Sequence, residues 1–370
     1  MVLLSTLSWL GLGQVTGSIK RVDAFAGLKS RPVKASTAVN YLLVGSDTRV
    51  GLTPAELKAL RVGSVASAAG KRSDTMLLVH ISKARDKAVI VSLPRDTYVT
   101  VPERTGADGK VVPATQAKLN AAFNWGGAPL LIQVIESITN LRIDHYVEIN
   151  FAGFAHMVDA LGGIQVCSKV NINDPKSHLV MTAGVHTLDG IEALKYVRTR
   201  DFDGMGDLGR MQRQQQFMSS ILRKATSTGV LLNPVKLVSF FNAAMDTVQT
   251  DAQLNTSDLL TLAKQLKNLS ASKVRTLTVP LSNVGYSVPG VGSTVVWDSV
   301  LAPQLFQRLR DDVAVVDLVT PTPKATPSSS LSTKKSPAPS NAGATPTPTA
   351  TIVDKFKTRT ASENPCGALK

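Results

Sequence analysis

Short apolar segments rich in β-branched residues constrain the fold of this chain most strongly. Their length and composition are typical of buried strands, and they are VNYLLVG at 39–45, TMLLVHIS at 75–82 and KAVIVSL at 87–93. Helical patterns and further strand-like segments alternate after them. The helices are expected at about 128–140, 151–161, 189–197, 209–225, 235–248 and 256–268, and the strands at 144–150, 163–168 and 274–279. This alternation predicts an α/β fold with three layers, α/β/α, around a central mixed β-sheet.

Composition changes at both ends of the chain and predicts its organisation. Residues 1–19 carry no charge and contain an apolar run, which predicts an export signal or a membrane anchor, with a buried helix as the alternative. Residues 20–36 are expected to be a linker, followed by one domain over 37–318. Pro, Thr, Ser and Ala dominate 319–351, a composition that predicts a disordered linker, and 352–370 form a short tail.

Charge and motif content exclude several classes of protein. The 41 Lys and Arg against 27 Asp and Glu give a formal charge of +14, and 43% hydrophobic residues suffice for a large core, which excludes wholesale disorder. The two cysteines, Cys167 and Cys366, match no zinc or redox spacing. No H-E-x-x-H or G-x-S-x-G motif occurs, so zinc hydrolase and serine esterase chemistry have no basis in the sequence. A helix-turn-helix, zinc-finger or RNA-binding signature is also absent, so nucleic acid is not an expected partner despite the basic charge.

Charged residues lie at the ends of the predicted strands. Asp47 follows the first strand, Arg72 and Asp74 precede the second, and Arg95 follows the third. Because ligands bind at strand ends in open α/β sheets, we expect these side chains to meet at one edge of the sheet. For each residue taken alone, a role as a surface cap or turn residue is the alternative.

A second group of cations follows the predicted helix at 189–197. Arg198 and Arg200 are two residues apart, so an extended chain would point both to the same side. Arg210 and Gln214 share one face of the next helix, beside an apolar stripe. A solvated basic face is the alternative. Arginines beside aspartates suit phosphoryl chemistry, because guanidinium groups bind phosphate oxygens and carboxylates hold a bridging Mg²⁺.

Seven motifs follow one another between about Asn40 and Ala225. They are NYLLVGSDTR, KRSDTMLLVHI, VIVSLPRDTYV, KLNAAFNWGG, LGGIQV, LDGIEALKYVRTR and GDLGRMQRQQ. Together, and in this order, they resemble the LytR-CpsA-Psr family of cell-wall glycopolymer transferases, in particular its actinobacterial members. The resemblance covers roughly half of the chain.

The resemblance implies an extracytoplasmic enzyme anchored in the cell membrane by one N-terminal helix. Such an enzyme moves a polyprenyl-pyrophosphate-linked glycopolymer onto peptidoglycan, forms a phosphodiester and releases polyprenyl phosphate, so donor, acceptor and membrane lipid are the implied partners. By motif position, Asp47 and Asp74 resemble the ligands of Mg²⁺. The residues that resemble the pyrophosphate-binding set are Arg72, Arg95, Arg198, Arg200, Arg210 and Gln214. Asp47, Asp74, Arg95 and Arg210 are the implied catalytic residues.

Further features follow from the resemblance, and several alternatives stay open. Helices around Leu130–Ile138 and Phe151–Leu161 are expected to line an apolar pocket for the polyprenyl chain, and a disulfide between Cys167 and Cys366 is compatible with actinobacterial members. The loop between Asp47 and Asp74 is longer than many members need, so we expect an altered rim. The alternatives are a Mg²⁺-dependent lipid-pyrophosphate pyrophosphatase and a non-catalytic polyprenyl-lipid or wall-binding protein. Arabinogalactan, a teichoic-acid-like polymer and capsule all stay open as the glycopolymer.

Overall fold

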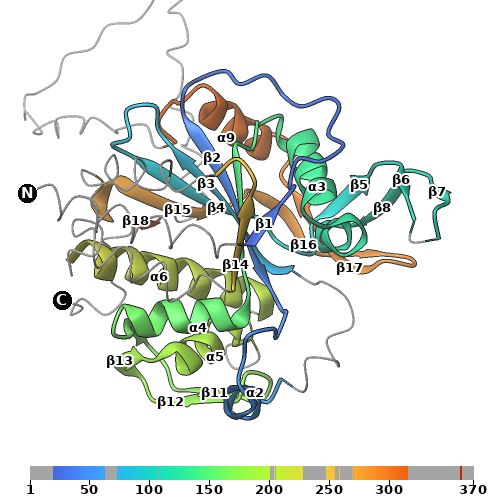
Figure 1. The fold of residues 1–370 in the computed structure, drawn as a ribbon. Helices are drawn as coiled ribbons and strands as arrows, with labels where there is room; N and C mark the ends of the chain where they lie inside the picture. Colours follow the sequence, from blue (N-terminus) through green and yellow to red (C-terminus); the bar gives the residue numbers. More distant parts are fainter. Residues whose placement is uncertain are drawn as a thin grey trace, which may run out of the picture.

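A central eight-stranded sheet organises the molecule (Figure 1). The structure is a computed structural model that describes residues 20–62, 73–106, 108–200, 204, 206–227, 247–254, 258, 269, 271–315 and 359–360. In spatial order the strands are β1 (Lys20–Val22), β14 (Val248–Asp251), β9 (His145–Ile149), β2 (Val39–Ser46), β3 (Ser73–Ile81), β4 (Ala88–Ser92), β15 (Val274–Thr278) and β18 (Arg359–Thr360). The sheet contains parallel pairs such as β2–β9 and β4–β15 and antiparallel pairs such as β2–β3. The predicted mixed sheet is therefore confirmed.

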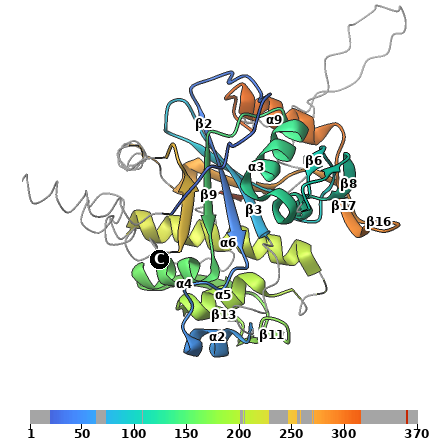
Figure 2. The ribbon, with the colours of Figure 1, turned by 45° about the vertical axis from the view of Figure 1, so that its right-hand side comes forward.

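Alternate residues of the central strands pack against different helices. Leu42 and Val44 of β2 belong to a core with α3 (Leu119–Thr139) and α9 (Leu301–Arg310). Tyr41 and Leu43 point to the opposite face, where α6 (Gly206–Ser227) packs on the sheet. Figures 1 and 2 show α3 and α9 on one side, and α4 (Phe151–Ala160), α5 (Gly190–Arg198) and α6 on the other. This arrangement confirms the predicted α/β/α layers.

A second hydrophobic core lies beneath the α4–α6 layer. It joins these helices to α2 (Pro54–Leu60) and to two small antiparallel sheets, β10 (Ile164–Ser168) with β13 (Gly184–Leu188), and β11 (Ile172–Asp174) with β12 (Leu179–Met181). The strand predicted at 163–168 thus forms, but outside the central sheet. Cys167 on this strand is disulfide-bonded. The only other cysteine of the sequence, Cys366, lies outside the described residues.

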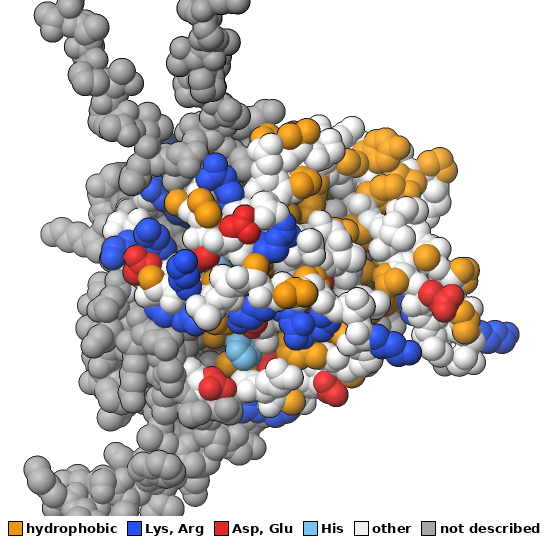
Figure 3. Space-filling model, turned by 90° about the horizontal axis from the view of Figure 1, so that it is seen from above, with side chains coloured by type: hydrophobic (Ala, Val, Ile, Leu, Met, Phe, Trp, Pro, Cys, Tyr) orange, Lys and Arg blue, Asp and Glu red, His pale blue; other side chains and the backbone are white. Residues whose placement is uncertain are grey.

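Further two-stranded sheets project at one end of the molecule. They pair β5 (Tyr98–Val101) with β8 (Thr115–Lys118), β6 (Arg104–Thr105) with β7 (Val111–Val112), and β16 (Leu281–Val288) with β17 (Gly292–Trp297). A 3₁₀ turn, η1 (Ala271–Lys273), precedes β15. Figure 3 shows hydrophobic side chains gathered toward this right-hand end, while charges of both signs are interspersed over the middle of the same face. Trp125 and Tyr286 are exposed large side chains of this region.

Residues 20–36, expected to be a linker, are instead part of the domain. β1 pairs in parallel with β14 at the edge of the sheet. Arg31 places its guanidinium on the buried carboxylate of Glu136 in α3, with contacts of 2.7–3.2 Å. The linker prediction failed because this segment has no long apolar run and is held by ion pairs and by a three-residue edge strand.

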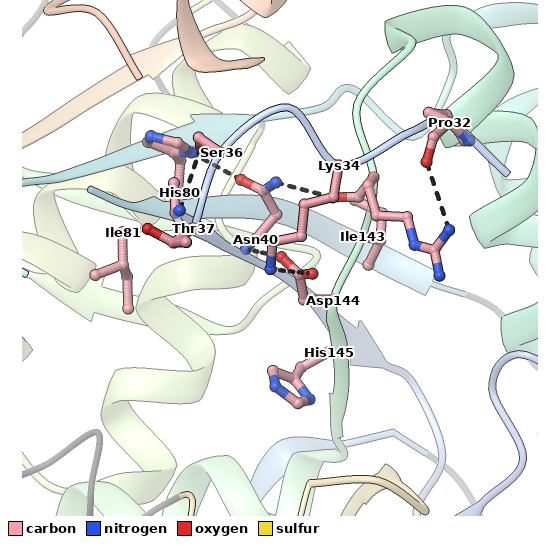
Figure 4. A network of polar contacts seen from close by, with 12 residues as sticks. Pro32, Lys34, Ser36, Thr37, Asn40, His80, Ile81, Ile143, Asp144 and His145 are labelled. Carbon is pink, nitrogen blue, oxygen red and sulfur yellow. Dashed lines mark hydrogen bonds and ion pairs between the residues drawn. The ribbon is translucent and has the colours of Figure 1, made fainter. Parts of the chain in front are cut away.

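A polar network fixes the start of β2 at the end of the sheet away from the strand ends discussed below (Figure 4). Asp144 accepts hydrogen bonds from Lys34 Nζ at 2.7 Å and from the main-chain N–H of Asn40 at 2.8 Å. The Asn40 amide donates to the Arg142 carbonyl, so its oxygen faces the Nδ1–H of His80 at 2.8 Å. The segment before β2 is therefore locked to the chain that enters β9.

Helix boundaries follow the sequence patterns with local exceptions. α4, α5 and α6 begin and end within about three residues of their predicted positions. α3 begins at Leu119 instead of 128, because Gly127 has a φ of 62° and Pro129 follows it, so only the part after this kink had been predicted. The helices predicted at 235–248 and 256–268 lie almost wholly outside the described residues, and Val248 belongs to β14.

The predicted anchor at 1–19 and linker at 319–351 also lie outside the described residues. Within the described part of the chain, no helix combines the length and apolar character needed to cross a membrane.

Candidate active site

An irregularity in the pairing of β2 with β3 positions the carboxylate of Asp74. Gly45 pairs with Thr75, but the next residue, Ser46, pairs with Ser73, so Asp74 is an extra residue in β3. Such bulges turn a side chain away from the regular pleat and are frequent beside functional sites. Asp47 follows Ser46 directly. The two aspartates therefore lie at neighbouring ends of β2 and β3, on the same side of the sheet, as the sequence predicted.

Arginines dominate the electrostatics around Asp74. The guanidinium of Arg95, in the segment after β4, forms an ion pair with the Asp74 carboxylate and contacts Asp96 at 3.3 Å. Burial alone would raise the pKa of Asp74, but the charges of Arg95 and Arg210 outweigh it and hold this pKa below its usual value. Asp74 is therefore an anion at neutral pH and a weak base.

The end of α5 presents two more predicted arginines. Arg198 is the last residue of the helix, and Thr199 has extended backbone angles, so Arg198 and Arg200 reach the same cavity. Two buried residues hold this short segment: Arg213 of α6 donates to the Thr199 carbonyl at 2.6 Å, and Asp174 accepts from the Arg200 main chain at 2.5 Å. The cations are thus fixed through their backbone.

Close packing of α5 on α4 sets the position of Arg198. Gly190 begins α5 against the backbone of Ala155, and a Cβ atom at Gly190 would lie 2.3 Å from the Ala155 carbonyl oxygen. The Gly190 N–H also donates to Asp159 at 2.8 Å. Burial lowers the pKa of Arg198 at the far end of the helix, while the nearby carboxylates of Asp74 and Asp47 oppose that effect. Arg198 Nη1 is buried without a hydrogen-bond partner among the described residues.

Helix α6 carries both charge and apolar surface toward the sheet. Arg210 is 3% exposed, and Gln214, one turn later, donates from its amide to the Val197 carbonyl at 3.3 Å. Gln215 bonds Ser92 on β4 and Thr278 on β15 at 3.1 and 2.8 Å, which ties the helix to the sheet. Met218 and Ile221 continue along the helix and line the same cavity.

These elements enclose a cavity of about 480 Å³ between the sheet and the α4–α6 layer. Among the described residues that line it, the charged side chains are the carboxylate of Asp74 and four cations, Lys176, Arg198, Arg200 and Arg210, and we call the part that they line the mouth. Its interior is apolar, with contributions from β2, β3, α4, α5 and α6 that include Leu43, Leu77, Phe154, Leu194 and Phe217. A cationic mouth over an apolar interior suits an amphipathic ligand whose head is a polyanion and whose tail is hydrocarbon.

The structure brings together most of the predicted site residues. Asp74, Arg198, Arg200, Arg210 and Gln214 line the cavity, and Arg95 reaches it through its ion pair with Asp74. Asp47 is not among the lining residues but lies next to Ser46, which is. Arg72 lies outside the described residues.

One prediction about the apolar pocket is wrong. Leu130–Ile138 belong to α3, which packs on the opposite face of the sheet, and their buried side chains form the core there. Their apolar pattern indicated burial correctly but carried no information about which face of the sheet they cover. The predicted segment Phe151–Leu161 does line the cavity, through Phe151, Phe154 and Met157.

Sequence reasoning missed residues that support the arginines. Lys176 follows β11 in the turn to β12 and lines the mouth, but no motif marks it. Asp174, 1% exposed, accepts main-chain hydrogen bonds from Lys176 and Ser177 as well as from Arg200. An Asp-Pro pair after a short strand signals a turn, yet it does not show that the turn reaches another segment.

Asp47 and Asp74 are possible ligands of one Mg²⁺ ion. The described residues contain no cluster of three or more His, Cys, Asp or Glu side chains able to hold a metal ion. Asp47 and Asp74 provide two carboxylates, and both act electrostatically on Arg198. Mg²⁺ is typically bound by one or two carboxylates together with substrate phosphates and water. The residues present therefore fit Mg²⁺ held jointly with a phosphate ligand.

Comparison with known proteins agrees with this geometry. The LytR_cpsA_psr family matches residues 14–298. Over 292 residues the chain is 37% identical to a probable cell wall biosynthesis protein, LcpB, of Corynebacterium glutamicum. The match covers 79% of this chain and 65% of LcpB. It is 32% identical over 286 residues to the polyisoprenyl-teichoic acid–peptidoglycan teichoic acid transferase TagU of Oceanobacillus iheyensis, covering 76% of each.

Solved structures share the fold. TagT of Bacillus subtilis, bound to LIIa-WTA, superposes with a TM-score of 0.56 at 25% identity, covering 78% of this chain and 98% of TagT. The fold and the charged cavity thus define a protein of the LytR-CpsA-Psr class. The chain belongs to the LytR_cpsA_psr family, and it spans about two thirds of the length of LcpB.

Proposed function

We propose that this protein is an extracytoplasmic phosphotransferase that moves a glycopolymer from a polyprenyl pyrophosphate carrier onto peptidoglycan. The observation that carries the proposal is the cavity itself, in which one carboxylate and a set of arginines surround the mouth of an apolar interior. The names of the relatives LcpB and TagU, which refer to cell wall biosynthesis and to transfer of teichoic acid to peptidoglycan, support this reaction class and a location at the cell envelope.

The donor would bind with its pyrophosphate at the mouth and its hydrocarbon chain inside. Arg198, Arg200 and Arg210 would bind the phosphate oxygens, since planar guanidinium groups make paired contacts to phosphate. Phe154, Phe217 and Met218 would contact the polyprenyl chain and keep water from the reacting phosphorus. Because the backbone that carries Arg198 and Arg200 is held by bonds to Arg213 and Asp174, little reorganisation of these two cations is needed when the charge on the leaving group develops.

In the proposed reaction a hydroxyl oxygen of the acceptor attacks the sugar-proximal phosphorus. The new P–O bond forms as the bond to the bridging oxygen breaks, polyprenyl phosphate leaves with the electron pair, and the released phosphate takes up the hydroxyl proton. Arg95 keeps Asp74 ionised and oriented. Mg²⁺, held by Asp47 and Asp74 with the pyrophosphate, would add positive charge at the oxygens of the leaving group.

A reconstituted reaction tests the proposal. The full chain is incubated with a short polyprenyl-pyrophosphate oligosaccharide, with Mg²⁺ or EDTA, and with soluble peptidoglycan fragments or buffer, and products are identified by mass spectrometry. We expect a phosphodiester-linked glycan on the acceptor only with Mg²⁺. Release of sugar phosphate at the same rate with and without acceptor would replace the transferase with a pyrophosphatase. Tight donor binding with no product under any condition would indicate a lipid-binding protein.

A further inference from the structure

A second cavity, of about 630 Å³, shares lining elements with the first. Its described lining residues come from α2, the β11–β12 sheet and α5, which Figures 1 and 2 show close together at one end of the molecule. Lys58 comes from α2 and Arg61 from its C-cap, while His178 comes from the β11–β12 turn and Lys195 from α5. None of these belongs to the residues assigned above to the pyrophosphate site.

Positive charge in this cavity is not neutralised by nearby carboxylates. Lys58, Arg61 and Lys195 form no ion pair with a carboxylate among the described residues. The carboxylate that lines the cavity, Asp174, is 1% exposed and accepts three main-chain N–H bonds. Glu56 on α2 is turned back onto the helix start, where it accepts from Thr53. Among the described residues, the side chains that line the cavity therefore leave a net positive charge, which an anionic ligand would balance.

The backbone around this cavity has left-handed residues at two of its lining positions. Arg61 has a φ of 50° at the end of α2, and His178 has a φ of 57° in its turn. This conformation costs free energy for residues other than glycine and tends to persist at binding sites. At Arg61 it is the left-handed C-cap of α2, and in both turns a basic side chain lines the same cavity.

The two cavities are neighbours through shared elements. On α5, Lys195 lines the second cavity, while Leu194 and Arg198 line the first. The turn after β11 has the same arrangement, because Asp174 and Pro175 line the second cavity and Lys176 lines the first. The same helix and the same turn therefore contribute residues to both cavities.

We infer that the cavity of Lys58, Arg61, His178 and Lys195 binds an anionic group of a saccharide chain whose reacting end lies at the pyrophosphate site. The inference rests on the proposed function for the identity of that chain. The anion is a carboxylate if the chain is the peptidoglycan acceptor and a phosphodiester if it is the donor glycopolymer. Two of the cations, Lys58 of α2 and Arg61 at its C-cap, come from the segment between Asp47 and Asp74.

A triple variant, Lys58→Gln with Arg61→Gln and Lys195→Gln, removes the charge without touching the first cavity. The matched control is Lys83→Gln with Lys87→Gln and Lys273→Gln, which lowers the net charge equally at the opposite end of the sheet. Two fluorescent probes are titrated into each full-length protein at 50 mM and 500 mM salt. One is a disaccharide-peptide fragment of peptidoglycan, and the other is a phosphodiester-linked oligosaccharide. Melting temperatures of all three proteins are compared.

For one of the two probes, we expect the triple variant to bind about tenfold or more weakly at 50 mM salt, with the difference shrinking at 500 mM because salt screens exposed charges. The probe that is affected identifies the acceptor or the donor as the source. Equal binding of both probes by the triple variant and the control would overturn the inference. Because binding is measured without turnover, a protein that binds but transfers nothing would count against the proposed function alone.

Discussion

Replacing Arg198 should preserve or raise the stability of the fold and lower the rate of transfer. Its buried Nη1 has no hydrogen-bond partner among the described residues, and an unsatisfied buried donor costs about 1–3 kcal/mol. Arg198→Met keeps a long side chain and removes that cost, while it loses the stacking of the guanidinium over Phe151, 5.1 Å away, worth about 1 kcal/mol. We therefore expect the variant to be between equally stable and about 2 kcal/mol more stable.

The rate of transfer should fall in the same variant. Arg198 is one of the cations at the mouth, and loss of one preorganised contact to developing charge typically lowers the rate about 10²- to 10³-fold. Arg213→Met is the matched control, because its guanidinium donates to the Thr199 carbonyl at 2.6 Å. Loss of a charged hydrogen bond costs about 1.5–3 kcal/mol, more than the stacking lost in Arg198→Met, so this variant should be less stable than Arg198→Met.

Urea unfolding followed by tryptophan fluorescence, together with the transfer assay, measures both quantities. Two results would refute the reasoning. One is an Arg198→Met protein destabilised by 2 kcal/mol or more, which would mean that the guanidinium stabilises the fold. The other is a normal transfer rate in that protein, which would remove Arg198 from the reaction.

Other substitutions test separate parts of the structure. Asp74→Asn should lower the transfer rate about 10²- to 10³-fold in steady-state assays, and a wild-type rate would exclude Asp74 from the mechanism. Arg31→Ala leaves Glu136, 3% exposed, without its cation, so urea unfolding should show a loss of about 3–5 kcal/mol; an unchanged midpoint would contradict the buried pair. Burial would raise the pKa of Asp251, but hydrogen bonds from His145 and the Tyr146 N–H hold this pKa below 3.8 in the folded protein. The ionised carboxylate therefore stabilises the fold above pH 3.8, and this contribution is lost as the pH falls through the lower folded pKa. Acid unfolding of Asp251→Asn should therefore depend less steeply on pH than that of the wild type, and equal slopes would argue against this contribution.

The sequence predicted those features that depend on local pattern. Apolar β-branched runs located the central strands, and helical patterns located most helices. Charges next to strand ends located Asp74 and Arg95, and charges at the end of a predicted helix located Arg198 and Arg200. These succeed because the side chain that reaches the site is adjacent to the pattern that positions its backbone.

Features that depend on distant contacts were missed or misplaced. Apolar residues of α3 and α4 have similar patterns, yet only α4 lies on the cavity side of the sheet. Residues 20–36 were expected to be a linker because their attachment depends on Glu136 and Asp144, more than a hundred residues away. Lys176 and Asp174 act through a turn that meets Arg200 only in the folded chain.

The contact between Gly190 and Ala155 makes the site vulnerable at a point that no ligand touches. A Cβ at 2.3 Å from the Ala155 oxygen lies about 1 Å inside ordinary contact, so any other residue at 190 would push α5 away from α4. Arg198 lies eight residues further along the same rigid helix, about 12 Å away at the usual helical rise. A displacement of about 1 Å at a reacting group costs about 10² in rate. Random mutagenesis should therefore yield folded, inactive proteins that are altered at Gly190, a residue without a side chain. The substitution would shift α5 as a rigid unit and so displace Arg198 from the phosphate.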